Sequence, residues 1–438
     1  MIKDLENNLT KYFSYFTVFY IIFTAVFSRT GTGFKIFSFR LGEIAVGLAI
    51  LYCVMSIFLF NFKFRYKRIK FSLLLMVFTF FITNLFFNSN FTNLYIYRSS
   101  TYIWFFSFLL IGTYAKKIEI NKSFDKYFYF LFIYIYILGI FNSEGILTNF
   151  LKDYSDKVEF HKGSEILLLF VCFFFLKNNF RERNPETYFT FLFFSSLYAP
   201  FLMYKSRASF ISLVFFVIFE LFLFYKKVNI QKKTIIISLL IILIIGTLST
   251  ILSQNYLIPD YESFPELIKS SYSNIVTDRY KTYDTELPFI YIENGRIFTA
   301  DGNLNWRLQM WQDMISFIGN NIQYSILGIG YQDRFPVFDI NLFEDAKYRL
   351  GLDGINEHLH NFFLTIFARG GVIHLACVLY IFLLIYQEYI KRYKDKKILI
   401  LLFCVFFVSF FDSSMENAHF PIIFYFFIGN QLINKSKL

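Results

Sequence analysis

The sequence has little charge and few cysteines for a chain of 438 residues. Asp, Glu, Lys and Arg make up only 17% of it, whereas 56% of the residues are hydrophobic. So small a charged fraction excludes a chain of ordinary soluble domains and is typical of a polytopic membrane protein. The four cysteines lie inside apolar stretches without paired spacing, which argues against a disulfide framework or a zinc site.

A nucleic-acid partner is also excluded, although the formal net charge is +11. The basic residues gather in short loops between apolar stretches, where membrane topology explains them better than nucleic acid does. No cleavable signal peptide is expected, because the start over 3–11 is polar and no small-residue cleavage site follows the first apolar run.

Apolar runs long enough to cross lipid recur along the chain. Because open sheet edges cannot face lipid, these runs must be helical, and we expect about twelve transmembrane helices. The predicted fold class is an all-α polytopic membrane protein with a large periplasmic loop that forms a small helical cap. The expected helices lie near residues 12–28, 41–60, 71–88, 101–115, 127–142, 164–177, 187–204, 206–225, 234–253, 361–387, 398–411 and 419–433.

The loops between these helices alternate in basic content. Five, four, three, four and five Lys or Arg residues occur in segments 61–70, 116–126, 177–186, 226–233 and 387–397. The other short loops have three, one and none, in segments 28–40, 88–100 and 412–419. Basic loops stay in the cytoplasm, so both termini are predicted to be cytoplasmic and the long loops 143–163 and 254–360 to lie outside.

The chain therefore divides into three predicted parts. Residues 1–253 form an N-terminal membrane bundle of about nine helices, and residues 361–438 form about three C-terminal membrane helices. The outer loop 254–360 differs from both, since it holds 15 Asp or Glu against 8 Lys or Arg and two of the three tryptophans. This composition predicts a small folded cap.

One stretch of the cap has the spacing of an amphipathic helix. Apolar residues fall at 308, 311, 315 and 318, and Asn305 is a candidate N-cap. Arg307 and Trp311 lie one turn apart on this helix. They either clamp a phosphate, with the indole against sugar or lipid, or form a surface arginine that covers a tryptophan.

The cap ends where polar sequence meets an apolar run, at Asn356–Leu364. Histidine titrates near neutrality, so His360 at this junction is the leading candidate for a catalytic group that takes a proton from a hydroxyl. His358 and Asn361 are neighbouring candidates for the substrate cavity. A metal held by His358 and His360 is disfavoured, because no nearby carboxylate or cysteine completes a ligand set.

Two further arginines are candidates. Ionisable groups at membrane depth are energetically costly, and those that occur there usually have a function. Arg207 lies in a tight outer turn among Ser206, Ala208 and Ser209, small residues that leave room for an anion beside the guanidinium. Arg369 precedes the Gly370–Gly371 pair in the helix after His360 and is a candidate for a cavity-facing residue.

These motifs, in this order, resemble the O-antigen ligase and O-antigen polymerase superfamily. The resemblance rests on Ser206–Ser209, on Arg307 with Trp311, on Leu327–Gly330 and on His360–Leu364 followed by Gly370–Gly371. It covers about residues 190–385 by motif and the whole chain by helix number. The chain departs from the family pattern at Arg369 and at His374, where the family usually has glycine.

The resemblance implies a glycosyltransferase of the bacterial inner membrane that needs neither metal nor cofactor. Its donor would be a glycan on undecaprenyl diphosphate, and its acceptor a sugar hydroxyl at the periplasmic face. Arg207 and Arg307 would bind the diphosphate, and His360 would act on the acceptor hydroxyl or stabilise the leaving group. Membrane lipids and a chain-length regulator are further implied partners.

Three functions remain open. A polymerase of surface-polysaccharide repeat units is favoured, and a ligase that joins the glycan to lipid A-core is the alternative in the same class. A flippase or transporter of the lipid-linked glycan is the alternative from another class. Transporters commonly have related halves, whereas the polar residues here gather in one cap and the adjoining helix ends, which favours chemistry at one face.

The alternating loop charges give a topological prediction. Reporter fusions at Gly302 and Lys394 should report opposite sides of the membrane, because the cap loop is expected outside and the basic loop 387–397 inside. Activity of a periplasmic and a cytoplasmic reporter at each site measures this. Fusions on the same side would contradict the topology.

Overall fold

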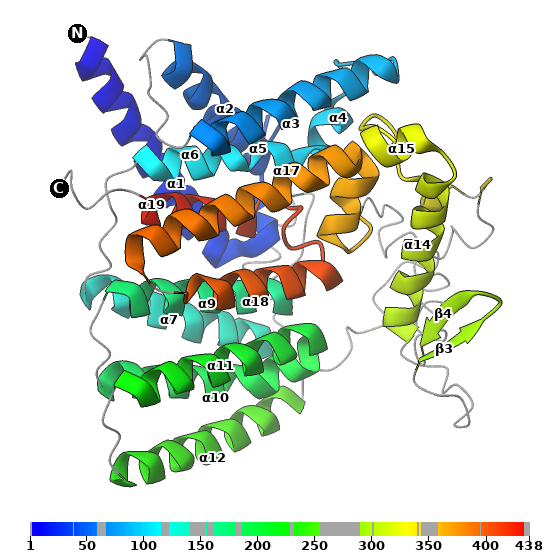
Figure 1. The fold of residues 1–438 in the computed structure, drawn as a ribbon. Coiled ribbons are helices and arrows are strands. Elements are labelled where there is room, and N and C mark those ends of the chain that lie inside the picture. The colour runs from blue at the N-terminus through cyan, green and yellow to red at the C-terminus, as the bar shows by residue number, and fades with distance from the viewer. Residues whose placement is uncertain are drawn as a thin grey trace. The chain divides into compact units, whose positions relative to one another are not determined.

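A computed structural model describes most of the chain and shows it to be mainly helical (Figure 1). The described residues are 2–37, 39–58, 67–114, 122–140, 154–155, 162–180, 185–227, 232–254, 290–299, 302–339, 341–342, 358–394 and 396–432. The all-α membrane class predicted from the apolar runs is confirmed in its main part, because these runs form helices.

The chain forms two compact units, and each contains segments distant in sequence. The first unit comprises residues 1–67, 104–257 and 382–438, and the second comprises residues 68–103 and 258–381. This division follows the contacts within the structure. The division into membrane bundle, cap and C-terminal helices follows the apolar runs of the sequence and stays a prediction.

The first unit is a helical bundle with one short hairpin. Figure 1 shows α9 and α18 side by side, then α10 and α11, with α12 at the edge. Its elements are α1 (Ile2–Thr32), β1 (Lys35–Ile36), β2 (Phe39–Arg40), α2 (Leu41–Phe58), α6 (Phe106–Tyr114), α7 (Lys122–Ile140), α9 (Gly163–Phe180), α10 (Pro185–Lys205), α11 (Arg207–Lys227), α12 (Lys232–Gln254), α18 (Ile398–Phe411) and α19 (Phe420–Gln431).

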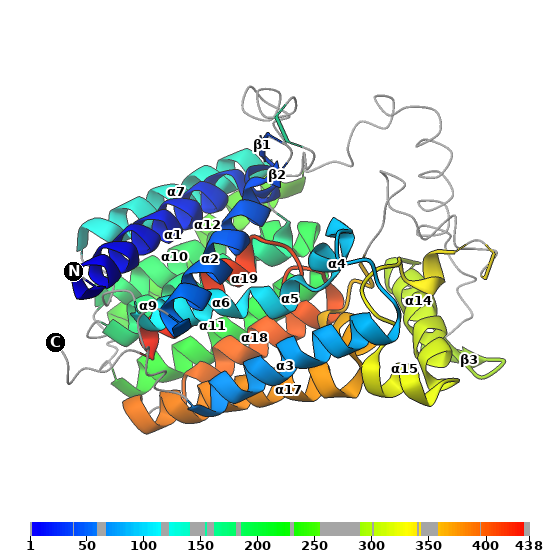
Figure 2. The same ribbon diagram turned by 90° about the horizontal axis from the view of Figure 1, so that it is seen from above.

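The second unit combines membrane-type helices with the described part of segment 254–360, which is predicted to form the cap. Figure 2 shows α3 alongside α17, with α15 and α14 following at one end of the pair. Its elements are α3 (Lys67–Phe86), α4 (Leu94–Ser99), α5 (Thr101–Trp104), β3 (Ile290–Glu293), β4 (Arg296–Thr299), α14 (Gly302–Gly319), α15 (Ile322–Leu327), the short 3-10 helix η2 (Pro336–Phe338) and α17 (Phe362–Tyr393), the last up to Ile381.

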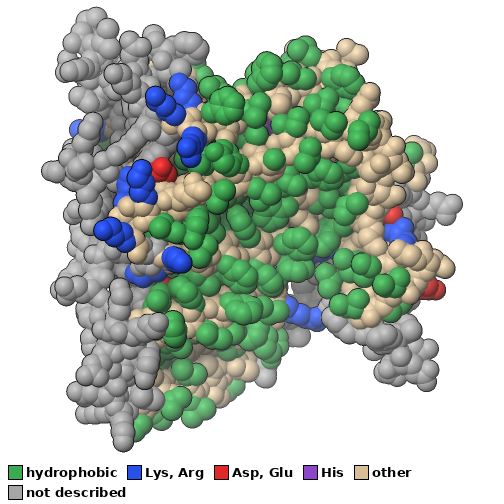
Figure 3. Space-filling view, viewed as in Figure 1, with side chains coloured by type: hydrophobic (Ala, Val, Ile, Leu, Met, Phe, Trp, Pro, Cys, Tyr) green, Lys and Arg blue, Asp and Glu red, His purple; other side chains and the backbone are tan. Residues whose placement is uncertain are grey.

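Among the residues that the structure describes, four helices are long and apolar enough to cross a membrane, and shorter apolar helices accompany them. The four lie at Lys11–Thr32, Lys67–Phe86, Ile236–Ser253 and Phe362–Tyr393. The shorter ones lie at Leu41–Met55, Thr101–Thr113, Lys126–Ile140, Gly163–Phe175, Ile398–Phe411 and Phe420–Gln431. Hydrophobic side chains cover most of the visible face of the helices (Figure 3). The total of about twelve spans stays a prediction.

The structure differs from the sequence-based expectation in its small strands and in some helix limits. Antiparallel hairpins β1–β2 and β3–β4 occur in a chain expected to be all helical. The turn of the second hairpin is Asn294–Gly295, with φ of 49° and 75°, which is the backbone of a tight hairpin turn. The helix expected over 101–115 is interrupted at Phe105, between α5 and α6.

Two glycines let α6 and α19 approach closely in the first unit. A Cβ atom at Gly112 would lie 2.2 Å from the Phe426 carbonyl oxygen, and one at Gly429 would lie 2.2 Å from the Leu109 carbonyl oxygen. In each case the obstacle is backbone, which cannot rotate away. The two helices are therefore in backbone contact, as small residues permit in membrane bundles.

Adding one methyl group at this crossing should destabilise the protein. Gly112→Ala and Gly429→Ala should each lower the melting temperature of the detergent-solubilised protein, because overpacking typically costs about 1–3 kcal/mol. Gly246→Ala in α12 is the control, since no atom lies within 4 Å of its Cβ position. Melting of Gly112→Ala at the wild-type temperature would show that the crossing is looser than described.

Candidate functional site

His360 lies in an unusual backbone conformation immediately before α17. Its φ of 53° falls in the left-handed region, which costs an L-residue about 1 kcal/mol and is often found at functional sites. Asn361 follows and caps α17, because its Oδ1 accepts from the backbone N–H of Leu364 at 3.0 Å. The junction predicted from the sequence is thus a sharp turn into a helix.

Helix α14 holds the turn that contains His360. The Trp311 indole donates from Nε1 to the Leu359 carbonyl at 2.6 Å, and the Trp306 ring lies 5.4 Å from the His360 ring between centroids. Arg307 directly follows Trp306 in the same helix. Within the second unit, the structure therefore brings together the α14 turn that carries Arg307 and the segment from His358 to Asn361.

Trp311 is a candidate site residue from the sequence, whereas Trp306 is not. The sequence left open whether Trp311 packs on a ligand or is covered by Arg307, and here its buried indole fixes the backbone next to His360. Trp306 was not predicted, and its ring contacts the ring of His360, the candidate catalytic group. In the sequence, only the position of Trp306 directly before Arg307 marks it as a residue of interest.

The β3–β4 hairpin fixes the orientation of α14. Gln309 and Gln312 bond the backbone of Ile297 on the free edge of β4, and Arg296 forms an ion pair with Asp313 at 2.7 Å. The predicted cap at Asn305 is wrong, because α14 begins at Gly302 and Asn305 accepts from the Thr299 backbone N–H instead. The amphipathic helix itself is confirmed and is longer than predicted.

Arg369 is buried and holds a loop of its own unit. Its guanidinium donates to the carbonyl oxygens of Gly330 and Asp333, at 3.1 and 2.5 Å, and to the Tyr95 hydroxyl at 3.1 Å. It also stacks over the Phe335 ring at 3.9 Å. These contacts of Arg369, a residue of α17, fix the loop that follows α15 against α17.

His374 reinforces the same loop from one turn further along α17. Its Nε2 lies 2.6 Å from the Thr79 hydroxyl, and its Nδ1 lies 2.6 and 2.9 Å from the hydroxyls of Tyr102 and Tyr331. Burial raises the pKa of the Tyr331 phenol, so this hydroxyl stays protonated. The two departures from the family pattern, Arg369 and His374, thus fix one loop together.

Arg207 belongs to the first unit, where it begins α11. Its side chain is exposed, and it follows Ser206, whose hydroxyl accepts from Ser209 Oγ at 2.8 Å. Gly163 at the start of α9 packs against Ser206, since a Cβ at Gly163 would lie 2.8 Å from that of Ser206. The turn predicted around Arg207 is present and lies against α9.

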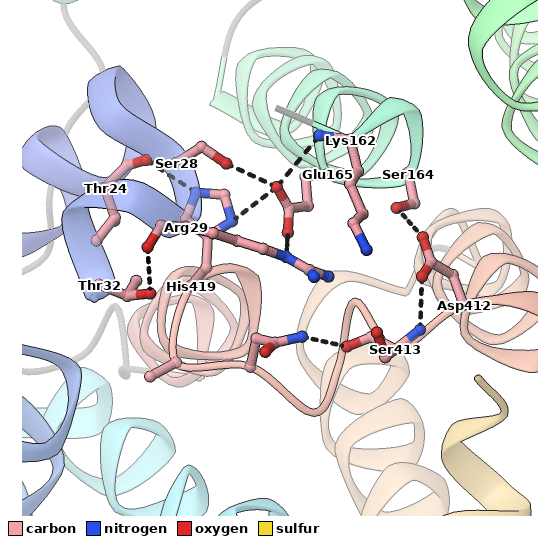
Figure 4. Close-up of polar contacts among 12 residues, drawn as sticks. Thr24, Ser28, Arg29, Thr32, Lys162, Ser164, Glu165, Asp412, Ser413 and His419 are labelled. Atoms are coloured by element: carbon pink, nitrogen blue, oxygen red, sulfur yellow. Dashed lines mark hydrogen bonds and ion pairs between the residues drawn. The ribbon is translucent and has the colours of Figure 1, made fainter. Parts of the chain in front are cut away.

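A buried charged cluster lies near the same end of α9 (Figure 4). Arg29 Nε contacts Glu165 Oε1 at 2.5 Å, and Ser28 donates to Glu165 Oε2 at 2.8 Å. His419 faces this carboxylate at 3.7 Å through Nδ1 and donates from Nε2 to the Thr24 carbonyl. Burial lowers the pKa of His419, which favours its neutral form.

The cluster joins segments that the loop charges predict to share one side of the membrane. Arg29 ends α1, Glu165 begins α9 and His419 precedes α19. Ser164 also donates to Asp412, and Lys35 donates its backbone N–H to Tyr154 at 2.8 Å. The sequence marked Glu165 as an ionisable group near a helix but could not identify its partners.

No group of three His, Cys, Asp or Glu that could hold a metal occurs among the residues that the structure describes. The predicted anion-binding residues Arg207 and Arg307 lie on α11 of the first unit and on α14 of the second. A guanidinium has planar donors that match phosphate oxygens, so each residue suits an anion by its chemistry.

Part of the chain is similar to a known protein family. Residues 191–379 match the family model described as O-antigen ligase. Over this segment, which is less than half of the chain, the sequence is similar to the O-antigen ligase family. No curated protein matches the sequence. The matched segment includes Arg207, Arg307, His360, Arg369 and His374. This similarity supports a glycosyltransferase function of the O-antigen ligase type.

Breaking the buried ion pair should destabilise the first unit. Glu165→Leu leaves the Arg29 charge buried without its partner, which typically costs about 3–5 kcal/mol, so thermal stability and yield should fall sharply. The double variant Arg29→Leu/Glu165→Leu should regain part of the loss, because no isolated charge remains. Glu43→Gln, at a half-buried position of α2, serves as the control. A stable Glu165→Leu protein would contradict the importance of the pair.

Proposed function

We propose that this protein transfers a glycan from an undecaprenyl diphosphate carrier to a sugar hydroxyl at the periplasmic face of the bacterial inner membrane. The observation that carries the proposal is the packing of the α14 turn with Arg307 against the left-handed turn at His360. A cation for the diphosphate and a base for the hydroxyl are thereby held on neighbouring segments of one unit.

His360 acts on the acceptor in this scheme. It takes the proton from the attacking hydroxyl as the new bond forms between that oxygen and C1 of the donor sugar. The bond from C1 to the diphosphate oxygen breaks, and the carrier diphosphate leaves with the electron pair. An in-line attack of this kind would invert the anomeric centre.

The arginines stabilise the negative charge that develops on the leaving diphosphate. Arg307 would do so from α14, next to Trp306 and His360. Arg207 would act as a second cation from the start of α11, where small neighbours leave space around an exposed guanidinium. Two guanidinium groups can neutralise a diphosphate without a metal, so the proposed reaction needs no cofactor.

Trp306 and Trp311 would position the histidine and not touch the sugar. The Trp311 indole fixes the Leu359 carbonyl, and the Trp306 ring limits the motion of the imidazole. His358 and Asn361 flank the catalytic residue, and Asn361 is already engaged as the cap of α17. Arg369 would support the site through the loop it binds.

We favour a polymerase of surface-polysaccharide repeat units over a ligase that acts on lipid A-core. The acceptor of a polymerase is a second carrier-linked glycan, and a chain-length regulator would be its partner. Deletion of the gene followed by gel analysis of the surface polysaccharide distinguishes the two. A ladder reduced to one repeat supports the polymerase, complete loss of attached glycan supports the ligase, and an unchanged ladder contradicts both.

The histidine prediction tests the proposed base. His360→Ala should lower the transfer rate by about 10²–10⁴-fold at unchanged protein level, because a positioned base contributes that much. His358→Ala is the matched control and should retain measurable product. Transfer would be measured with purified protein and a lipid-linked donor. Activity in both single variants would leave the proposed reaction without its base.

The arginine prediction tests the diphosphate site. Arg207→Lys and Arg307→Lys should each lower activity about tenfold or more, since a hydrogen bond to a charged group contributes about 1.5–3 kcal/mol and lysine cannot form the bidentate pair. Arg334→Lys, an exposed position outside this site, should have no effect. Wild-type rates in both Arg207→Lys and Arg307→Lys would exclude these residues from diphosphate binding.

A further inference from the structure

Helix α17 changes its surroundings at Gly371. The helix has 32 residues, and Gly371 breaks it with φ of 68° and ψ of −170°. No residue from Phe362 to Gly370 is exposed, whereas Val372 is 50% exposed and further exposed apolar side chains follow at Leu379 and Tyr380. In a membrane protein, exposed apolar side chains on a spanning helix face lipid, so the contact with lipid begins at the break.

Length supports the same boundary. At 1.5 Å per residue, the whole of α17 would be about 48 Å long, well beyond the hydrocarbon core of about 30 Å. The part from Gly371 to Tyr393 is about 34 Å long and suffices to span that core. The segment Phe362–Gly370 is then a short helix packed within protein, between His360 and the lipid.

Helix α15 is fixed at this boundary by backbone contacts. A Cβ at Gly371 would lie 1.9 Å from the Ile326 carbonyl oxygen, and a Cβ at Gly328 would lie 2.3 Å from the Arg369 carbonyl group. The Ile329 N–H donates to the Ala368 carbonyl at 2.8 Å. The end of α15 therefore lies directly on the break of α17.

The other side of α15 meets the end of a second membrane helix. The Tyr324 ring lies 6.1 Å from the ring of Phe87, which directly follows α3, and stacks on Phe317 of α14 at 5.6 Å. Near that end of α3, Leu85 and Phe86 are exposed apolar residues. Figure 2 shows α15 at the end of the α3 and α17 pair. The end of α3 and the end of the lipid-facing part of α17 thus both lie beside α15.

The outer face of α15 is apolar, although the helix belongs to the cap. Ile322 and Ile326 lie four residues apart on one face and are 74% and 44% exposed. Gln323 beside them is exposed and polar. A water-facing turn would not normally present two isoleucines next to the ends of two lipid-facing helices.

We propose that α15 is an interfacial helix, with Ile322 and Ile326 inserted among the lipids of the bilayer where α3 and α17 leave it. Lipid is favoured over a protein partner because two side chains offer far less than the roughly 800 Å² that each partner buries in a stable protein interface. The patch also belongs to a helix that contacts the end of α3 and the break of α17, where exposed side chains are apolar. This anchor would hold the α14 end of the cap at a fixed depth.

Site-directed spin labelling tests the proposal without any measurement of transfer. Labels are placed at Ile322→Cys and Ile326→Cys, with Gln323→Cys as the matched control and Leu379→Cys as the lipid-facing reference. The full chain is reconstituted as one copy in each phospholipid nanodisc, and collisions of each label with oxygen and with a water-soluble nickel chelate are compared. Unmutated protein corrects for its four cysteines, three of which are buried.

The expected result is a ratio of oxygen to nickel collisions at positions 322 and 326 that approaches the ratio at 379 and exceeds the ratio at 323 severalfold. A ratio equal to that at 323 would place both isoleucines in water and overturn the proposal. Few collisions with either reagent would indicate cover by protein, which also overturns it. Since no enzymatic activity is measured, neither outcome bears on the proposed glycosyl transfer.

Discussion

A charged or strongly polar side chain inside an apolar bundle has no water to solvate it, so it must find its partners within the protein. In the first unit this constraint unites Arg29, Glu165 and His419 from three segments far apart in sequence. In the second unit it unites Arg369 with carbonyl groups and His374 with three hydroxyls. Each set joins segments that the apolar surface alone would leave free to slide past one another.

The candidate site depends on the second of these sets. Arg369 and His374 fix the loop after α15, and η2 in that loop packs on α14. Helix α14 in turn carries Trp306 and Trp311, which contact His360 and Leu359, and Arg307, which follows Trp306 in the sequence. The side chains of the proposed chemistry are therefore held by a series of contacts. The series begins at Arg369 and His374, two buried polar residues of α17.

Much of this arrangement could be predicted from local sequence. The apolar runs predicted the helices, and the spacing of Leu308, Trp311 and Ile315 predicted the helix that carries Arg307. The start of that helix was misjudged because Asn305 has the chemistry of a cap but is used by Thr299 of the adjacent hairpin. The hairpin had a recognisable signal of its own, Asn294–Gly295, between two strands too short to stand out.

The pairings between distant segments could not be predicted, since no local pattern encodes them. Glu165 and Arg29 are 136 residues apart, and Tyr102 and His374 are 272 apart. A single sequence shows that such residues are costly in lipid, but it does not show which of them meet. The contact of Trp306 with His360 has the same origin, because it depends on how the cap folds back.

The glycines that join the end of α15 to the break of α17 have a consequence for how this sequence can vary. At Gly328 and Gly371 the neighbouring atoms belong to backbone, so no smaller side chain elsewhere could make room for a larger one there. Other contacts of α15 are made by side chains, such as the Tyr324 ring with the rings of Phe87 and Phe317, and apolar side chains can be exchanged with local repacking. Substitutions can thus change most side chains where the end of α15 meets α17, while Gly328 and Gly371 tolerate only glycine.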